Sequence, residues 1–318
     1  MITVVGFNTA IDCRVDLDVL QPGRVQRAVS ADARPGGKGL HVAETAAALG
    51  EPVVLVGLTD GVHADELRNR LCTRGVEWRP VQTAQPLRQC LAIHESDGRV
   101  TEILEPGATL SLDTREALLL AVRSAIDQSK VLVFCGSLPR GFAPDTYAGL
   151  IREASARGVR CLLDASADAL REGIGASPWL AKPNADEAGF LLGRPVRGIN
   201  DAVDCVRKLH RAGVARAVVT LGASGTVGFD GKALWHATSA PAEVRNSVGS
   251  GDCFLAGLAV AAARDEPFNA ALRRAVACGA ANAESVDTGD ASLDRVTAWL
   301  PRVMVKAVSA GVGSRSRQ

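Results

Sequence analysis

The hydrophobic positions of the chain fall into short continuous runs separated by longer amphipathic stretches, a pattern typical of strands followed by helices. Residues 2–7 and 52–58 are continuous apolar runs of the kind found in buried strands. Between them, Val42, Ala46 and Leu49 fall on one helical face that ends at Gly50. The same alternation predicts further helices at 64–74, 113–128, 144–157, 185–192, 200–212, 250–263, 268–284 and 292–300, and further strands at 131–135, 159–164, 215–220, 225–229 and 232–237.

Two segments break this alternation. Residues 13–34 lack helical periodicity, and residues 85–105 contain two alternating runs around the turn Ser96-Asp97-Gly98, which predicts a hairpin. Repeated strand–helix units predict an α/β fold with a doubly wound, mainly parallel sheet covered by helices on both faces. We therefore expect one domain over residues 1–308, in which the two exceptional segments form a small β-sheet lid. The Gly- and Ser-rich residues 309–318 are expected to be a disordered tail.

Composition narrows the class of protein. A chain of 318 residues with 47% hydrophobic residues can bury a large core. A net charge of +1, from 36 basic and 35 acidic residues, gives no sign of nucleic-acid or membrane binding. No apolar run reaches the ~20 residues of a membrane span, and the N-terminus resembles a strand rather than a signal peptide. Because the eight cysteines are scattered without a C-x-x-C pair, we expect a cytoplasmic protein.

The most informative stretch for chemistry is residues 246–254, which reads as a loop turning into a helix. Gly249, Ser250 and Gly251 allow a tight turn whose N–H groups can approach a ligand. The helix that follows directs unpaired N–H groups and a positive dipole end at the loop, which suits a phosphate. Asp252 at the helix start is a candidate proton acceptor. The alternative is an acidic residue near the cap of a buried helix. Cys253 has no activating base in the sequence that would make it a nucleophile.

Other polar residues come directly after predicted strands. Asp12 follows the first strand, residues 136–139 and 220–225 follow two later ones, and residues 182–187 follow the segment ending at Leu180. In doubly wound sheets, ligands bind outside the carboxyl ends of the strands. The sequence therefore predicts that these residues meet residues 246–254 in one site, although Asp12 could also simply cap a turn.

The order and spacing of these motifs resemble the ribokinase-type (PfkB) carbohydrate kinases, and most closely their phosphosugar branch, which includes 1-phosphofructokinase and tagatose-6-phosphate kinase. The resemblance covers nearly the whole chain. The motifs on which it rests are Asn8-x-Ala10-x-Asp12, 36–39 (Gly-Gly-Lys-Gly), Arg88, 101–107, 136–139 (Gly-Ser-Leu-Pro), Lys182-Pro183-Asn184-x-x-Glu187, Gly222-x-x-Gly225 and 248–252 (Val-Gly-Ser-Gly-Asp).

The resemblance implies roles for these residues. Asp252 would be the general base toward the sugar hydroxyl, and the backbone of Gly249, Ser250 and Gly251 would hold the transferring phosphoryl group. Lys38 and Arg88 would bind the phosphate that the sugar already carries. The full set of implied sugar-phosphate residues is Asp12, Gly36, Gly37, Lys38, His41, Arg88, Ser137 and, in the inserted segment, Arg27.

The resemblance also implies a site for ATP and Mg²⁺. Asn184 and Glu187 would act on Mg²⁺, largely through water, although their spacing also suits a helix-capping pair. The remaining residues implied for the nucleotide are Lys182, Asn184, Thr220, Gly222, Gly225, Gly279 and Asn282. Gly279 and Asn282, with Cys278, would form the adenine wall, although small residues on a late helix also mark tight packing.

One departure from the family pattern concerns the substrate. His41 stands where the phosphosugar kinases usually have Asn, and imidazole arranges its donor and acceptor differently from an amide.

The resemblance implies ATP-dependent phosphorylation of a phosphorylated ketohexose, most simply fructose 1-phosphate, with tagatose 6-phosphate and fructose 6-phosphate as alternatives. A non-catalytic sugar-phosphate sensor on the same fold remains open. A nicotinamide-dependent oxidoreductase is disfavoured, because no glycine fingerprint follows the first strand. We expect a homodimer in which the lid sheets pair.

Overall fold

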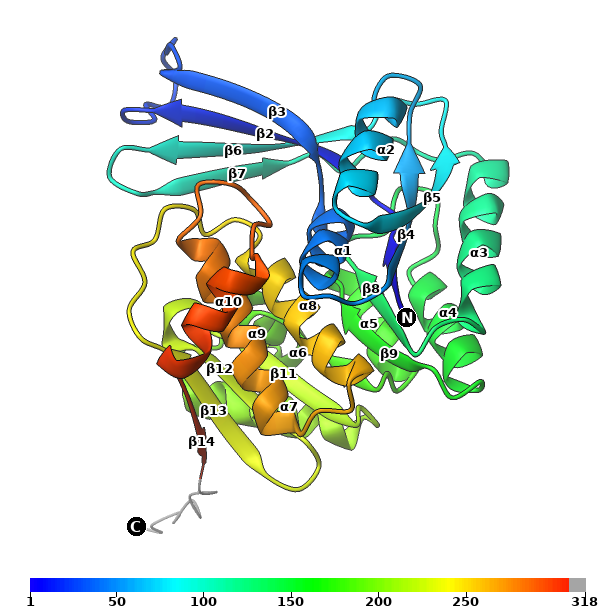
Figure 1. The fold of residues 1–318 in the computed structure, drawn as a ribbon, viewed down its shortest axis with the longest axis vertical. Helices are drawn as coiled ribbons and strands as arrows, with labels where there is room; N and C mark the ends of the chain where they lie inside the picture. Colours follow the sequence, from blue (N-terminus) through cyan, green and yellow to red (C-terminus); the bar gives the residue numbers. More distant parts are fainter. Residues whose placement is uncertain (309–318) are drawn as a thin grey trace.

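A ten-stranded, mostly parallel sheet forms the centre of the computed structural model, which describes residues 1–308 (Figure 1). Every neighbouring pair from β11 to β5 is parallel, and β12, β13 and β14 extend the sheet antiparallel. In spatial order the strands are β14 (Val303–Ala307), β13 (Leu234–Ser239), β12 (Thr226–Phe229), β11 (Arg216–Thr220), β10 (Leu180–Ala181), β9 (Arg160–Asp164), β8 (Val131–Cys135), β1 (Ile2–Gly6), β4 (Val53–Thr59) and β5 (Val76–Gln82).

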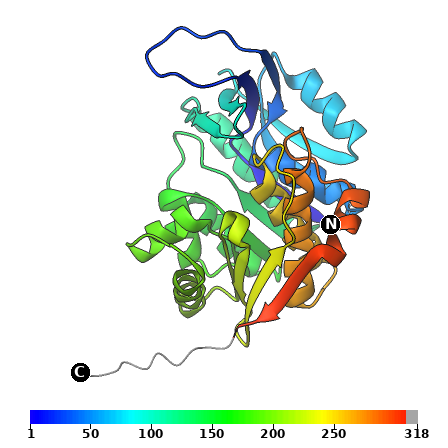
Figure 2. The same ribbon diagram turned by 90° about the vertical axis from the view of Figure 1, so that its left-hand side faces the viewer.

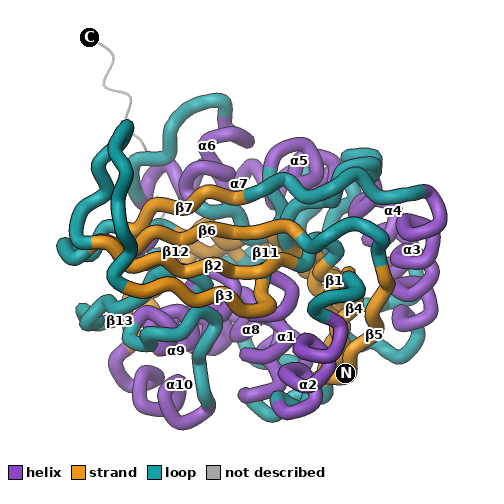
Figure 3. Tube along the Cα trace, turned by 90° about the horizontal axis from the view of Figure 1, so that it is seen from above, coloured by secondary structure: helices purple, strands orange, loops and turns teal. Residues whose placement is uncertain are grey.

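Helices cover both faces of this sheet, as the view from above shows (Figure 3). One layer consists of α1 (Lys38–Ala48), α2 (Ala64–Thr73), α8 (Ser250–Ala263), α9 (Phe268–Ala283) and α10 (Leu293–Trp299). The other consists of α3 (Leu112–Ile126), α4 (Thr146–Ser155), α5 (Ala167–Gly175), α6 (Ala185–Leu192) and α7 (Ile199–Arg211). Short 3₁₀ turns, η1 (Gly222–Ser224) and η2 (Leu300–Arg302), complete the described elements. The central strands β1, β4, β8, β9 and β10 are almost entirely buried, as expected for a two-sided parallel sheet, whereas the outer strands β5, β13 and β14 are partly exposed.

The two segments that break the α/β alternation pair with each other. A separate four-stranded sheet, hereafter the lid sheet, has the order β3 (Ser30–Gly36), β2 (Ala10–Leu17), β6 (Arg88–Glu95) and β7 (Val100–Leu104). It overhangs the main sheet, and its outer end carries the loop 18–29 (Figures 1 and 2). The predicted small separate sheet is therefore present, with the predicted hairpin formed by β6 and β7.

Besides the two 3₁₀ turns, four elements were not predicted from the sequence. β10 has only two residues, too few for a periodic signal. β5 escapes the pattern because Pro80 interrupts it, and the strand is tolerated there because it lies at the edge of the sheet. α5 is short, and its two glycines weaken the helical signal. β14 adds to the opposite edge, beside β13. The predicted tail, residues 309–318, lies outside the described residues. Within residues 1–308, no helix combines the length and apolarity that crossing a membrane requires.

Close packing between α1 and β1 fixes the position of the α1 N-terminus. A Cβ on Gly39 would lie 2.6 Å from Cα of Gly6, so a side chain at either position would force the helix away from the strand. Gly37, before the first residue of α1, has φ of 92°, a conformation that glycine adopts without strain. These contacts determine where Lys38 and His41, in the first turn of α1, can reach.

We expect Gly39→Ala to lower the free energy of unfolding by ~1–3 kcal/mol, the usual cost of overpacking. Gly149→Ala is the matched control, because Gly149 is also helical and a Cβ added there would meet no atom within 4 Å. That substitution should raise stability by ~0.4–1 kcal/mol through the entropy of the unfolded chain. Urea unfolding measures both, and equal midpoints for the two variants would contradict the packing argument.

Candidate active site

One group of candidate site residues, some predicted and some not, lies at or just beyond the carboxyl ends of the parallel strands, beneath the lid sheet. Asn8 follows β1, Ser137 follows β8, Asp164 ends β9 and Lys182 follows β10. β1 lies between β8 and β4, so the chain order reverses there, and such a switch point is where α/β sheets bind ligands. A cavity of about 490 Å³ opens under the lid sheet, with Asp12 and His41 among its lining residues.

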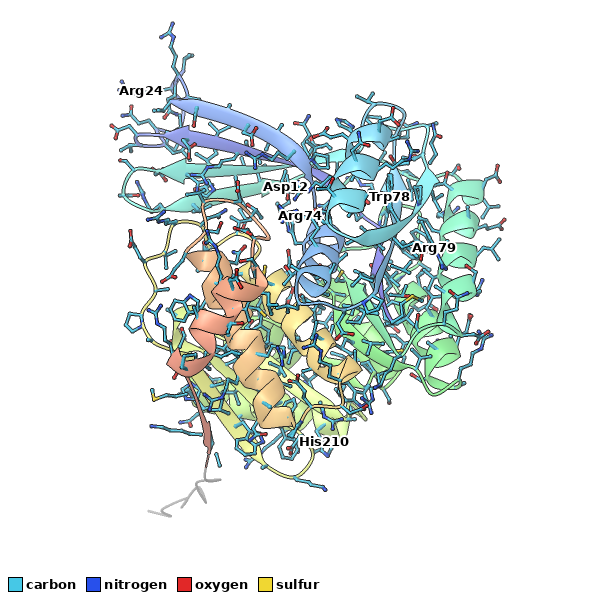
Figure 4. The ribbon with its side chains drawn as sticks, viewed as in Figure 1. Asp12, Arg24, Arg74, Trp78, Arg79 and His210 are labelled. Carbon is cyan, nitrogen blue, oxygen red and sulfur yellow. The ribbon has the colours of Figure 1, made fainter. Side chains whose placement is uncertain are left out.

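Asp12 lies on β2, where the lid sheet meets the body (Figure 4). A Cβ on Gly36 would lie 2.0 Å from Asp12 Oδ2, so only glycine at position 36 leaves room for this carboxylate. Oδ2 accepts a hydrogen bond from the Gly37 N–H at 3.2 Å. Burial alone would raise the pKa of Asp12, but hydrogen bonding to His41 and to the Gly37 N–H holds it below its usual value. Gly36 thus leaves room for the Asp12 carboxylate, and the Gly37 N–H helps to lower its pKa.

His41 lies between two carboxylates. Its Nε2 is 3.0 Å from Asp12 Oδ2, and its Nδ1 is 3.1 Å from Asp252 Oδ2. The side chain is only 5% exposed. Burial opposes its charge, but the hydrogen bonds and charges of Asp12 and Asp252 raise the pKa of His41 to about 10. The sequence identified His41 as a departure from the family pattern but gave no indication of this bridge.

Asp252 lies in the first turn of α8, which the structure begins at Ser250 as predicted. It is buried, and within residues 1–308 its Oδ1 accepts no hydrogen bond. The N–H groups of Asp252 and Cys253 bond to the Gly249 carbonyl, whereas the N–H groups of Gly249 and Gly251 have no partner in the part of the chain that the structure describes. A free carboxylate oxygen therefore lies beside two free N–H groups at a helix N-terminus, which suits a proton acceptor beside a bound phosphate.

Two buried asparagines hold the loop before α8 against the loop 285–290. Asn246 donates to Thr288 Oγ1 at 2.9 Å and accepts from Val248 N–H at 3.0 Å. Asn282 donates to Ser250 Oγ at 2.9 Å and accepts from Gly289 N–H at 2.8 Å. These bonds fix the position of the N–H groups at the start of α8. Asn246 was not predicted as a site residue.

Two of the three residues expected to form the adenine wall, Cys278 and Asn282, are buried. Asn282 has no exposed surface, and all its bonds serve the loops around the α8 N-terminus. Cys278 is equally buried and packs where Gly257 leaves space. A Cβ on Gly279 would lie 3.2 Å from the Ser250 carbonyl oxygen, so Gly279 lets α9 approach α8. The packing alternative explains Asn282 and Cys278, which face the protein interior, whereas Gly279 is partly exposed and its adenine role stays a prediction.

A second charged cluster lies around Asp164, which contacts Lys38 and Lys182. This residue is 1% exposed, and its Oδ2 is 3.1 Å from Lys182 Nζ and 3.5 Å from Lys38 Nζ. Although burial opposes the charge of Lys38, its pKa is raised by Asp164 first and by Asp252 next. Asp164 was not among the predicted site residues, although its place at a strand end follows the rule that identified the others.

Asn184 and Glu187 form the capping box that was the structural alternative to a metal role. Asn184 Oδ1 accepts from the Glu187 N–H, and Glu187 Oε2 accepts from the Asn184 N–H, both at 2.9 Å. Burial and the charge of Asp164 raise the pKa of Glu187. Asp164 Oδ1 is buried and has no hydrogen-bond partner. Two repelling carboxylates with an unsatisfied oxygen fit a hard cation.

This oxygen set fits Mg²⁺ bound together with a nucleotide. Within residues 1–308, no group of three or more His, Cys, Asp and Glu side chains is arranged to hold a metal ion. Mg²⁺ normally uses only one or two carboxylates and completes its shell with phosphate oxygens and water. Glu187 and Asp164 can supply those carboxylates.

Arg88 belongs to a third group, at the inner end of β6. Its Nε donates to the Asn8 carbonyl at 3.2 Å, and its Nη1 to the Glu105 carbonyl at 3.0 Å. Asn8 in turn donates to Ser137 Oγ at 2.8 Å. Arg88 forms no ion pair with any residue in 1–308. Its charge is therefore available to an anion.

Arg27 is not brought to the other candidates. It is exposed in the loop 18–29, at the outer end of the lid sheet, where Figure 4 labels its neighbour Arg24. Asp12 lies near the opposite end of β2, because it pairs with Arg34 whereas Asp16 pairs with Ser30. A strand rises ~3.4 Å per residue, which separates the loop from Asp12 by about 20 Å.

The loop after β11 contains the last predicted group. Thr220 bonds through its N–H to the Pro183 carbonyl, which places the loop beside Asn184. A Cβ on Gly225 would lie 2.2 Å from the Ala237 carbonyl oxygen, whereas Gly222 faces open space. Thr220, Gly222 and Gly225 therefore form one turn beside the Asp164 cluster.

Burial raises the pKa of Cys253 well above its usual value, which excludes a reactive thiolate.

Comparison with known proteins identifies the family. The model of the pfkB family of carbohydrate kinases matches residues 1–295. The chain belongs to the pfkB family. A phosphofructokinase-2 from Escherichia coli, crystallised with potassium, is 26% identical, with a TM-score of 0.85 over 95% of this chain and 98% of that one.

More distant structures share the fold of this pfkB protein. A protein named "possible 1-phosphofructokinase" from Thermotoga maritima is 21% identical, with a TM-score of 0.84 over 96% of this chain and 99% of that one. Ribokinase from Arabidopsis thaliana is 22% identical, with a TM-score of 0.75 over 94% of this chain and 98% of that one. The predicted ribokinase-like α/β fold and the predicted membership of the carbohydrate kinases are thus confirmed.

Proposed function

We propose that this pfkB-family kinase transfers the γ-phosphoryl group of MgATP to the free primary hydroxyl of a phosphorylated ketohexose, with fructose 1-phosphate as the first candidate. The observation that supports a phosphorylated acceptor is Arg88, a cation without a carboxylate partner, beside the Asn8–Ser137 pair. The observation that supports kinase chemistry is the free Oδ1 of Asp252 next to the free N–H groups of Gly249 and Gly251.

In this proposal Asp252 receives the proton of the attacking hydroxyl. The N–H groups of Gly249 and Gly251 bind the transferring phosphoryl group where negative charge develops. Gly249 has φ of 81°, and a Cβ there would lie 2.9 Å from the Gly289 nitrogen, so only glycine permits this backbone. Asp12 holds sugar hydroxyls against the backbone of Gly36 and Gly37. Phosphoryl transfer depends mainly on such positioning and charge stabilisation.

The nucleotide would lie over the turn 220–225, with its phosphates toward Lys38 and the α8 N-terminus. Mg²⁺ would be held by Glu187 and Asp164, partly through water, and would neutralise phosphate charge. Lys182, whose Nζ lies 3.1 Å from Asp164 Oδ2, holds that carboxylate in place. The contacts of Lys38 with the Asp164 cluster favour a role toward the transferring phosphoryl group. They do not favour the predicted pairing of Lys38 with Arg88 on the sugar phosphate.

Two other acceptors and one other function remain as candidates. Fructose 6-phosphate is suggested by a structure of the Escherichia coli phosphofructokinase-2, 24% identical, in complex with that sugar, and tagatose 6-phosphate presents a similar phosphate. A non-catalytic sugar-phosphate sensor would need Arg88 but not Asp252. ATP-consumption assays with fructose 1-phosphate, tagatose 6-phosphate, fructose 6-phosphate and unphosphorylated sugars distinguish these possibilities.

A homodimer through the lid sheet is part of the proposal. Val25 and Val29 in the loop 18–29 are 97% and 79% exposed, and Ile103 on β7 is 56% exposed. Exposed apolar residues along a small sheet favour pairing with another surface. Sedimentation should show a dimer, which Ile103→Lys should weaken. A wild-type monomer at micromolar concentration would contradict this assembly.

We expect Asp252→Asn to lower kcat by ~10²–10⁴-fold, the range for loss of a general base. ATP affinity should hardly change, because the N–H groups at the α8 start remain. Asp113→Asn is the matched control, since Asp113 is an exposed acid in the first turn of α3. Steady-state kinetics with the preferred sugar measure the effect. A fall of less than tenfold would assign Asp252 to helix capping.

We expect Arg88→Ala to raise KM for the phosphosugar by ~10–100-fold, as loss of charge-assisted hydrogen bonds of ~1.5–3 kcal/mol implies. KM for ATP should stay near the wild-type value, since the substitution removes binding of the sugar substrate alone. Arg99→Ala, in the turn between β6 and β7, removes a 61% exposed arginine of the same sheet and serves as the control. An unchanged phosphosugar KM in Arg88→Ala, or equal turnover of unphosphorylated sugars, would refute a phosphorylated acceptor.

A further inference from the structure

His41 contacts both carboxylates that the proposed function assigns to the acceptor sugar. Its two ring nitrogens lie 3.0 Å from Asp12 and 3.1 Å from Asp252. The three residues come from β2 in the lid sheet, from α1 and from α8. His41 therefore links the carboxylate that would bind the sugar directly to the carboxylate that would take its proton.

The contacts define the protonation state of the ring. A neutral imidazole has one N–H donor and one bare nitrogen, and an ionised carboxylate only accepts hydrogen bonds. Both nitrogens can donate only in the imidazolium form. The alternative, in which a protonated carboxyl donates to the bare nitrogen, conflicts at Asp12 with a pKa below the usual value. The cation also offsets the repulsion between Asp12 and Asp252.

The surroundings of the ring hold it in this bridge. A Cβ on Gly289 would lie 2.7 Å from His41 Cδ2, so the loop 285–290 packs against the ring, and position 289 must be glycine. Gly289 has φ of 75° and is fixed by its N–H bond to Asn282. One turn further along α1, Thr45 Oγ1 lies 3.4 Å from the Gly289 carbonyl. The loop thus leaves the imidazole little room to turn away from the two carboxylates.

We propose that His41 is a positioning and specificity-determining residue, whose imidazolium holds Asp12 and Asp252 at a fixed separation so that one acceptor sugar spans both carboxylates. This role rests on the proposed function. The bridge occupies Oδ2 of each carboxylate and leaves Oδ1 of each for sugar hydroxyls. An asparagine at position 41 is shorter and uncharged, and its single amide nitrogen cannot span the two carboxylates as two ring nitrogens do. Sugars whose hydroxyls do not match this separation would be rejected.

Charged groups from several elements face the cavity beside His41. They are Asp12 and Arg14 on β2, Asp32 and Arg34 on β3, Glu44 on α1, Arg70 and Arg74 on α2, His94 and Glu102 in the lid sheet, and Asp287 and Asp290 in the loop 285–290. Asp252 on α8 contacts His41 directly. Arg70 is paired with Glu44 and Arg34 with Asp287, so the carboxylates that contact His41 remain its dominant partners. Because the pKa of His41 is raised from 6.5 to about 10, its contribution to stability is complete below pH 6.5 and lost as pH rises through about 10.

Nitrogen-15 NMR of the five histidines tests the bridge without relying on activity. At pH 8 the wild type should show one histidine with both ring nitrogens protonated. This signal should be absent in His41→Asn, and in Asp12→Asn it should titrate at lower pH. His63→Asn is the matched control, because His63 also contacts a carboxylate, that of Asp60, outside the site. A neutral His41 at pH 8 would overturn the inference, whether or not the enzyme phosphorylates sugars.

Kinetics then test the positioning role. We expect His41→Asn to lower kcat/KM for the preferred phosphosugar by ~10–100-fold, as misplacement of reacting groups does. KM for ATP should be unchanged, and discrimination between fructose 1-phosphate and tagatose 6-phosphate should weaken. Wild-type activity should fall as pH rises through about 10, where His41 loses its charge, and this fall should be absent in His41→Asn. Wild-type kinetics and discrimination in His41→Asn would refute positioning, whereas a wild type inactive on every sugar would refute the proposed function itself.

Discussion

Compensation of buried charge beneath the lid sheet is the constraint on which the rest of the site depends. Asp164 and Asp252 are buried and Asp12 is partly buried, and an isolated buried carboxylate is costly. Cations from the first turn of α1 and from the end of β10 offset this cost. His41 contacts Asp12 and Asp252, while Lys38 and Lys182 contact Asp164. Since Lys38 and His41 lie in one helical turn, the position of α1 determines both compensations.

Glycines make that arrangement sterically possible. α1 reaches the site because Gly39 contacts Gly6, Asp12 fits because position 36 has no side chain, and the ring of His41 fits because position 289 has none. Each of these contacts joins segments distant in sequence. The hydrogen bonds of Asn282 then lock the start of α8 to the loop 285–290. Packing and buried hydrogen bonds, as well as the helix itself, therefore determine the direction in which the free N–H groups at the α8 N-terminus point.

The sequence predicts local and periodic features well, and pairings between distant segments poorly. The α/β alternation, the separate small sheet and the start of α8 follow from patterns within short windows. β5 and β14 are edge strands, whose formation depends on a neighbour that no local pattern reveals. In the site, the motif containing Asp252 was visible, but the bridge through His41 joins residues 211 positions apart. The burial and hydrogen-bond partners of Asn282 are properties of the folded chain and cannot be read from a local pattern. The sequence therefore assigned Asn282 to the adenine site.

Charge balance also bears on where an anionic substrate can bind. Lys38 and Lys182 contact Asp164, with Glu187 nearby, so on this side of the site charges of both signs already offset one another. Around His41 there are two carboxylates for one cation, which would repel a phosphate. Arg88 differs from both groups, because its guanidinium is held by two backbone carbonyls, which orient it without neutralising it. A phosphate on the acceptor sugar would therefore find uncompensated positive charge at Arg88, while its hydroxyls meet Asp12 and Asp252. In the proposed function, the phosphates of ATP would instead meet Lys38, the N–H groups at the α8 N-terminus and a metal ion. Under the proposed function, two polyanionic substrates would thus be separated because each would meet a different kind of positive charge.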